Sequence, residues 1–277
     1  MTVGYLNINS IRHKLKNLHT FLGDNIDVLA ISETKLDEAF TTSKLILPGY
    51  KPPFRLDYSD SSGGLLVYAR SDILIHQLTS FVFPKGIEVI PLEINLRKTK
   101  WCIFVIYRNP TIFKSKAKIE QFLSTLSAGL DFYSRSYDNF MVVGDFNLEP
   151  ENELLKNFMN ANDLYNLVKE KTCFKSENGT CIDLILTNRK HSFQFTGALE
   201  TGSSDYHLLI HTMMRSTYVK LPPVRKKYRD YKNFNSVIFL NELNFQLKDK
   251  NIVNYSLFEK IFVNLLDEHA PLKTRLI

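Results

Sequence analysis

The chain has 277 residues, of which 44% are hydrophobic, and it carries a formal net charge of +6. This length suits one domain or one domain with an appendage, and the hydrophobic content excludes a disordered chain. Three cysteines without CxxC spacing, no signal-peptide pattern at the N-terminus and no apolar run long enough to span a bilayer favour an intracellular protein that is not secreted.

Short runs typical of β-strands recur along the first 215 residues. Each is rich in β-branched and aromatic residues and is bounded by polar residues, glycine or proline. The predicted strands cover residues 3–8, 27–32, 64–69, 88–94, 101–107, 139–144, 181–187 and 207–212.

Amphipathic helices are predicted between some of these strands, the first of them capped by Ser10. Their apolar faces consist of Ile11, Leu15, Leu18 and Leu22; of Ile119, Phe122, Leu123, Leu126 and Leu130; and of Leu154, Leu155 and Phe158. Many strands with few helices predict a layered α/β (α+β) domain in which two sheets face each other and helices lie outside.

The pattern changes after residue 215, where we place a boundary between a domain (1–215) and a basic tail (216–277). The tail carries 11 Lys/Arg and 6 Asp/Glu, so most of the net charge lies there. Its segment 218–232 holds six basic residues and one acid, a composition that attracts polyanions such as nucleic acid. On composition alone, a solvated linker is the preferred interpretation of this segment. The tract from about 234 to 268 indicates a weakly structured, partly helical continuation.

Polar side chains gather where the predicted strands end, and the rim of a sheet is where active sites commonly lie. Taken singly, each of them also fits a turn, a helix cap or an ordinary surface group. The set consists of Asn7, Asn9, Glu33, Tyr107, Asp145, Asn147, Asp183, Asp205 and His207.

Asp183 is the hardest of these to explain as an ordinary polar residue. It lies inside the apolar run CIDLILT, and a buried carboxylate without a partner is costly. His207 is the base in a comparable context, and an Asp–His pair fixes the tautomer of the imidazole and raises its basicity. We therefore expect the two side chains to pair.

Familiar motifs for several enzyme classes are absent from the sequence. It has no Cys/His set with zinc spacing, no GxxxxGK[ST] loop, no strand-to-helix GxGxxG and no GxSxG elbow. Acids and asparagines at strand ends suit a hard cation such as Mg²⁺, which favours phosphate-ester chemistry.

Seven motifs carry a resemblance to a known family: LNINS, ISETKL, GGLLVY, VIYRNP, VVGDFN, IDLILTN and SDYH, in that order. In order and spacing they resemble the endonuclease/exonuclease/phosphatase superfamily. More narrowly, residues 3–215 resemble the apurinic-type endonuclease domain of LINE-like (non-LTR) retrotransposons of the CR1/jockey/Rex-type branch. DEHAPLKTR in the tail resembles the linker before the reverse transcriptase of such elements, which implies an endonuclease fragment or a truncated copy.

The resemblance implies a four-layer sandwich, two facing mixed β-sheets flanked by helices, and it assigns roles. The metal ligands would be Glu33, Asn7 and Asp205, holding Mg²⁺, with Mn²⁺ as a substitute. Asp145 would orient or deprotonate water or protonate the leaving oxygen, and Asn147 would donate to the phosphoryl oxygen. Asp183 would orient His207. Phosphate or substrate contacts would come from Tyr107, Thr172, Asn9, Ser204 and Arg108.

SDYH departs from the family pattern, in which histidine directly follows aspartate. Here Tyr206 separates Asp205 from His207. In a regular strand this shift would turn the histidine to the opposite face and damage the site. A bulge or loop at Tyr206 would restore its direction, and we expect this outcome, with His207 as the catalytic histidine.

The resemblance implies a Mg²⁺-dependent endonuclease that nicks one strand of duplex DNA and leaves a 3′-hydroxyl to prime retrotransposition. The basic segment 220–232 would add phosphate contacts, no membrane would be involved, and a reverse transcriptase would follow in a full-length element. We expect an intracellular location, nuclear or cytoplasmic, and a chromosomal substrate implies the nucleus. The alternatives are action on abasic sites or small phosphoesters, and a decayed or domesticated copy that only binds nucleic acid.

Overall fold

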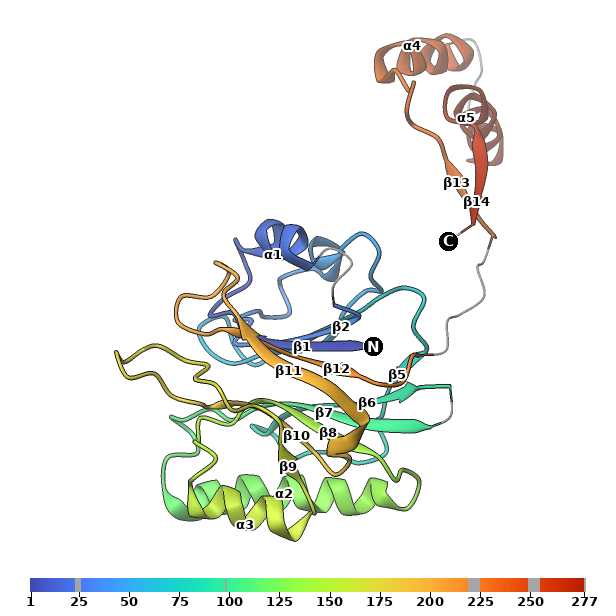
Figure 1. The fold of residues 1–277 in the computed structure, drawn as a ribbon. Helices are drawn as coiled ribbons and strands as arrows, with labels where there is room; N and C mark the ends of the chain where they lie inside the picture. Colours follow the sequence, from blue (N-terminus) through green and yellow to red (C-terminus); the bar gives the residue numbers. More distant parts are fainter. Residues whose placement is uncertain (23–25, 98, 219–224, 249–254, 277) are drawn as a thin grey trace. The chain divides into compact units, whose positions relative to one another are not determined.

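Two six-stranded β-sheets face each other in the computed structural model, which describes residues 1–22, 26–97, 99–218, 225–248 and 255–276 (Figure 1). The first sheet contains β11 (Phe193–Leu199), β12 (Leu209–Met214), β1 (Thr2–Asn7), β2 (Val28–Ser32), β4 (Leu65–Ala69) and β3 (Phe54–Leu56), in this spatial order. The second contains β5 (Ile75–Gln77), β6 (Glu88–Asn95), β7 (Lys100–Tyr107), β8 (Phe140–Asp145), β10 (Asp183–Thr187) and β9 (Tyr165–Asn166). The predicted fold class and all eight predicted strands are confirmed, whereas β3, β5, β9 and β11 were not predicted.

The two sheets share one pattern of strand pairing. Each has a central parallel pair, β1 with β2 and β7 with β8, and antiparallel neighbours on both sides. Parallel strands end at the same edge of a sheet, so Asn7 pairs with Ser32 and Tyr107 pairs with Asp145. The sheet topology therefore gathers the polar strand ends.

Helices cover the outer faces of the two sheets. In Figure 1, α1 (Leu15–Leu22) lies outside the first sheet, and α2 (Lys116–Ser134) and α3 (Glu153–Ala161) lie outside the second. Ser115 and Asn152 cap α2 and α3 by accepting backbone N–H bonds. The predicted helix cap at Ser10 is wrong, because α1 begins only at Leu15. Ser10 instead has φ +80° and donates its N–H to Glu33 O at 2.7 Å.

The core has two main layers of apolar side chains. Between the sheets, residues such as Tyr5 and Val67 of the first meet Ile90 and Val105 of the second, and the same cluster continues to Phe122 of α2. A second cluster lies between the first sheet and α1; the side chain of Leu22, predicted to belong there, lies outside the described residues. Each fully buried Leu, Ile or Phe contributes roughly 1.5–3 kcal/mol, so these layers hold the sheet edges in place.

The chain divides into two units, Met1–Leu221 and Pro222–Ile277. In the second unit, β13 (Arg225–Arg229) pairs antiparallel with β14 (Leu272–Leu276). α4 (Ser236–Leu247) and α5 (Tyr255–His269) bury a small cluster of Phe239, Leu243, Ile261 and Leu265. Helices were expected here, but the basic segment contributes a paired strand rather than only a linker; its residues 219–224 lie outside the described residues.

Within the described ranges, no helix is long and apolar enough to cross a membrane. Cys102, Cys173 and Cys181 are buried free thiols.

Candidate active site

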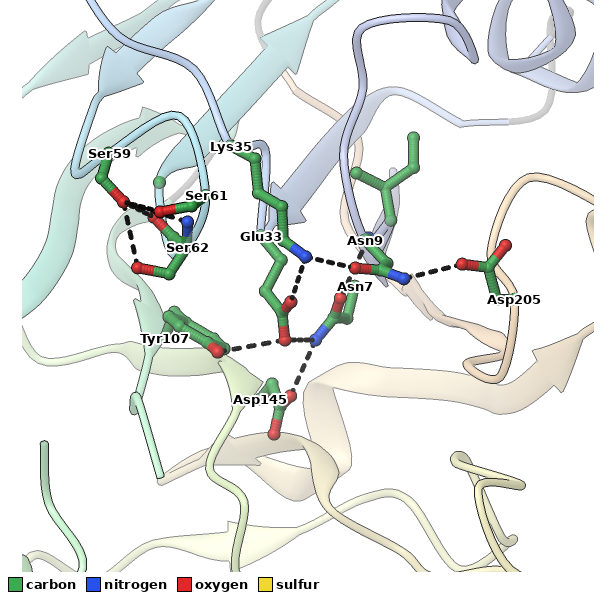
Figure 2. Close-up of polar contacts among 12 residues, drawn as sticks. Asn7, Asn9, Glu33, Lys35, Ser59, Ser61, Ser62, Tyr107, Asp145 and Asp205 are labelled. Carbon is green, nitrogen blue, oxygen red and sulfur yellow. Dashed lines mark hydrogen bonds and ion pairs between the residues drawn. The ribbon is translucent and has the colours of Figure 1, made fainter. Parts of the chain in front are cut away.

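Asn7 joins carboxylates from the two sheets. At the end of β1, its Nδ2 donates to Glu33 Oε1 at 2.9 Å and to Asp145 Oδ2 at 3.0 Å (Figure 2). The Tyr107 hydroxyl, from the end of β7, donates to the same Glu33 oxygen at 3.0 Å. Four residues that the sequence singled out at separate strand ends thus form one hydrogen-bonded group.

The backbone around Glu33 is held in an unusual conformation. Glu33 and Lys35 have φ values of +50° and +53°, a region that non-glycine residues occupy at a cost of order 1–3 kcal/mol. The segment is fixed because Thr34 N donates to Gly64 O (3.3 Å) and Lys35 N to Gly63 O (3.0 Å). Such maintained strain directs the Glu33 carboxylate toward Asn7 and Tyr107.

Glu88 supports this glycine pair from the second sheet. Its Oε2 accepts the N–H of Gly64 at 2.6 Å, and a Cβ at Gly63 would lie 2.5 Å from its Oε1. Only glycine fits there, because Gly63 also has φ +67°. Glu88 is 2% exposed, and burial raises its pKa to about 7. Glu88 was not among the predicted site residues, although an acid next to an apolar strand is a signal similar to that of Asp183.

Asp145 and Asp183 pair directly across β8 and β10, and both are almost fully buried. Asp145 accepts Asn147 N at Oδ1 (2.7 Å) and Asn7 Nδ2 at Oδ2. Burial raises the pKa of Asp145 well above its usual range, and the nearby charge of Asp183 raises it further. The site therefore concentrates negative charge that a bound cation would stabilise.

The expected pair of Asp183 and His207 is present. Asp183 Oδ2 lies 2.9 Å from His207 Nδ1, and His207 Nε2 lies 3.5 Å from Cys173 Sγ. Burial lowers the pKa of His207, but the bond to Asp183 outweighs it, and the pKa rises well above the usual value. The arrangement holds the imidazole in one orientation.

Tyr206 does not turn His207 away from Asp183. Residues 202–206 form a bend before β12, Tyr206 is 49% exposed, and His207 is 4% exposed. His207 is held by an isolated antiparallel bridge to Cys173, and Leu208 N donates to Thr172 O at 2.8 Å. A loop rather than a bulge in the strand restores the direction.

Asp205 lies apart from the buried acids. Its carboxylate is about half exposed and accepts Asn9 Nδ2 at 2.7 Å (Figure 2). It also contacts Lys14 Nζ at 3.3 Å. Asn9 in turn accepts a bond from Lys35, which contacts Glu33 Oε2 at 3.6 Å. Asp205 is thus linked to Glu33 only through Asn9 and Lys35, and its metal role stays a prediction.

A second candidate metal set is formed by Asp145, Asp183 and His207, whose ligand atoms lie within 4.8 Å of one another. Asp183 Oδ1 is buried and has no hydrogen-bond partner among the described residues. However, Mg²⁺ usually keeps several waters and prefers oxygen ligands, and these three side chains are 4% exposed or less. Glu33, whose side chain is 16% exposed, suits a hydrated Mg²⁺ better.

Two predicted substrate contacts have structural partners instead. Arg108 is 3% exposed and donates to Phe113 O, Phe146 O and, at 2.7 Å, Asn147 O, so its geometry favours positioning of the GDFN loop. Thr172 is fully buried, and its hydroxyl accepts the N–H groups of Ile182 and Asp183.

Ser204 and Asn147 lie at the same rim. Ser204 Oγ accepts His207 N at 3.2 Å, which fixes the bend before the histidine. Asn147 has φ +49° and donates one amide N–H to Arg108 O at 3.0 Å.

Beneath the acids, Tyr5 forms a hydrogen bond with Ser32 that was not predicted. Tyr5 is fully buried in the layer between the sheets. Burial raises its pKa far above the usual value, so its hydroxyl stays neutral.

A model of the Endonuclease/Exonuclease/phosphatase family matches residues 4–205 of the chain. No curated protein sequence matches it significantly.

Several solved structures have a similar fold. A 3′-5′ exonuclease (NExo) from Neisseria meningitidis has a TM-score of 0.62 and 17% identity, covering 77% of this chain and 99% of its own. The Xenopus laevis APE2 catalytic domain has a TM-score of 0.61 and 18% identity over 80% and 94% of the two chains. The endonuclease domain of TRAS1, a telomere-specific non-LTR retrotransposon, has a TM-score of 0.60 and 11% identity over 77% and 98%. At these identities the likeness shows the fold.

Proposed function

The chain belongs to the endonuclease/exonuclease/phosphatase family and is a phosphodiester hydrolase, and we propose that it nicks one strand of duplex DNA. The observation that carries this proposal is the buried Asp183–His207 pair beside Asp145, at a rim where the second sheet supplies both aspartates and the first sheet supplies Asn7 and, just after β2, Glu33. Position, burial and hydrogen bonding there suit general acid–base chemistry on a phosphate ester.

In the proposed reaction, a water oxygen attacks phosphorus in line with the leaving 3′ oxygen. Asp145 orients this water and takes its proton, because both its oxygens are fixed by N–H donors. The P–O3′ bond breaks as the new P–O bond forms, the 3′ oxygen receives a proton, and the products are a 3′-hydroxyl and a 5′-phosphate. His207, oriented by Asp183, and Asn147 donate to phosphoryl oxygens as charge builds there.

Glu33 is our proposed principal ligand for a divalent cation, Mg²⁺ or Mn²⁺. The donor set fits, since the carboxylate accepts from Asn7 and Tyr107 on one oxygen and contacts a single lysine on the other. A bound cation would neutralise charge on the phosphate. Asn7 and Tyr107 keep the carboxylate pointed toward the rim.

Two observations support DNA as the substrate and a retrotransposon as the origin of the chain. The net charge of +6 favours a polyanion. The seven motifs resemble LINE-like endonucleases, and the TRAS1 endonuclease domain has a similar fold. In our proposal the 3′-hydroxyl primes a reverse transcriptase that follows in the full element, and the protein acts in the nucleus.

Nicking of supercoiled plasmid in Mg²⁺ and in EDTA tests the proposal. We expect Mg²⁺-dependent nicking by the wild type and a loss of about 10²-fold or more with Asp145→Ala, Glu33→Ala or His207→Ala. Parallel substrates, an abasic duplex and inositol phosphates, separate this function from its two enzymatic alternatives. If neither Glu33→Ala nor Asp145→Ala slowed nicking, the site assignment would be wrong.

The alternative of a decayed copy that only binds nucleic acid rested on Tyr206. The inward placement of His207 beside Asp183 removes that support. Metal-independent binding by a well-folded chain that never nicks DNA would restore this alternative.

A further inference from the structure

The β13–β14 ribbon of the second unit is unusually rich in cations. Four of the five β13 residues and two of the five β14 residues are Lys or Arg. The two strands pair over five registered positions, and the first four residues of β13 are exposed. The ribbon therefore presents dense positive charge on a defined, paired backbone.

Two of these cations stabilise the unit itself. Arg229 donates to Asp267 Oδ1 at 2.6 Å and to Ala270 O at 3.1 Å. Lys273 forms an ion pair with Asp230 at 2.5 Å. The Arg229 contacts tie the ribbon to the end of α5, and the Lys273 ion pair links β14 to the residue that follows β13.

The remaining four cations, Arg225, Lys226, Lys227 and Arg275, have no side-chain hydrogen bond or ion pair to any residue that the structure describes. Lys226 lies directly opposite Arg275, and like charges in this position destabilise a strand pair. Tyr228, 44% exposed, lies opposite Lys273. Residues directly opposite each other on two strands point to the same face of the ribbon. Because side chains alternate along a strand, both pairs lie on one face.

We propose that the face formed by Lys226, Tyr228, Lys273 and Arg275 binds the phosphate backbone of duplex DNA, at a site separate from the nicking centre. Lys226 and Arg275 would contact phosphates, the Tyr228 hydroxyl would donate to a phosphate oxygen, and the repulsion between Lys226 and Arg275 would be relieved on binding. A two-stranded ribbon also fits the width of the major groove. The proposal rests on the proposed function only for the choice of DNA as the polyanion.

Two alternative roles for these cations lead to different results. Lysines on a short two-stranded ribbon can simply prevent the outer edges of its strands from pairing with other chains. A surface of acidic lipid would also attract the cations. Neither role predicts a contribution to DNA affinity.

The test measures binding of a DNA duplex by the full chain in EDTA at several salt concentrations, so that no cleavage step enters. Each phosphate contact contributes about 0.9 to the slope of log K against log salt. The slope of the double variant Lys226→Gln/Arg275→Gln should therefore be smaller in magnitude by about 1.8 than that of the wild type. At 0.1 M salt its affinity should fall roughly tenfold for each lost phosphate contact.

A matched control removes the same charge from exposed lysines of the first unit, Lys118→Gln/Lys156→Gln on α2 and α3. We expect its slope to equal that of the wild type. An unchanged slope for the ribbon variant, an equal loss in the control, or loss of binding only to phosphatidylserine vesicles would each overturn the proposal. Because the assay contains no metal, its result is independent of whether the chain nicks DNA.

Discussion

Replacing Glu88 by glutamine should make the first unit more stable at neutral and alkaline pH. Glu88 is 2% exposed, its Oε2 accepts Gly64 N at 2.6 Å, and its Oε1 has no hydrogen-bond partner among the described residues. Burial raises its pKa from 4.5 to about 7, the Gly64 N–H lowers it, and Glu33 raises it again. Glutamine keeps the acceptor for Gly64 but carries no charge to bury.

The sign follows from proton binding. Between pH 4.5 and 7 the unfolded chain has lost the Glu88 proton while the folded chain keeps it, so the folded wild type loses stability as pH rises through this window. The rise in the pKa of Glu88 from 4.5 to about 7 lowers the free energy of unfolding of the wild type by roughly 3 kcal/mol at pH 8 and by almost nothing at pH 4. For a domain of this size, roughly 3 kcal/mol raises Tm by about 6–12 °C.

Thermal and denaturant unfolding of wild type and Glu88→Gln from pH 4 to 8.5, without metal, measures this difference. Glu93, on the same strand, supplies a control of opposite sign. Burial raises the pKa of Glu93, but bonds from Tyr137 and Asn95 and the charge of Lys100 outweigh it and lower the pKa. Glu93→Gln should thus lose stability above pH 4.5. A Glu88→Gln stability difference that did not vary with pH would refute the reasoning.

Three further substitutions have expected outcomes. Asp183→Asn should lower the pKa of His207 and slow single-turnover nicking about 10²–10⁴-fold, and an unchanged rate would exclude the pair from catalysis. Arg108→Met leaves three loop carbonyls without their donor, so the free energy of unfolding should fall by about 3 kcal/mol or more, measured by denaturant titration. Gly144→Ala places a Cβ 2.0 Å from Ile106 O between paired strands, a cost of roughly 3 kcal/mol or more; a variant with wild-type Tm would contradict this.

The strands that were predicted correctly are apolar enough for their composition alone to indicate a buried strand. Runs such as WCIFVIY are apolar on both faces, and the structure buries them between the layers. β3, β5 and β9 have three residues or fewer, too short for a periodic signal. β13 finds its partner, β14, across the whole α4–α5 pair, so a local pattern could not show that the basic segment is a strand.

Most of the residues that gather at the rim were predictable, but of their contacts only the Asp183–His207 pair was predicted. Strand ends indicated Asn7, Glu33 and Asp145 because parallel neighbours end at one edge. Which donor meets which acceptor depends on register between sheets, which no single strand encodes. Arg108 illustrates this limit: a cation beside a motif suggests a phosphate contact, yet folding places its guanidinium against backbone carbonyls.

The direction of the His207 side chain could not be decided from the rule that a one-residue shift in a strand turns a side chain to the opposite face. A residue inserted within a regular strand turns every following side chain over. Tyr206 precedes β12, however, and the preceding bend absorbs the extra residue before the ladder begins at Leu209. The direction of His207 is set by its bridge to Cys173 rather than by its spacing from Asp205. Asp205, which precedes Tyr206, contacts Asn9 and Lys14 outside the buried group, so the direction of His207 does not depend on where Asp205 points.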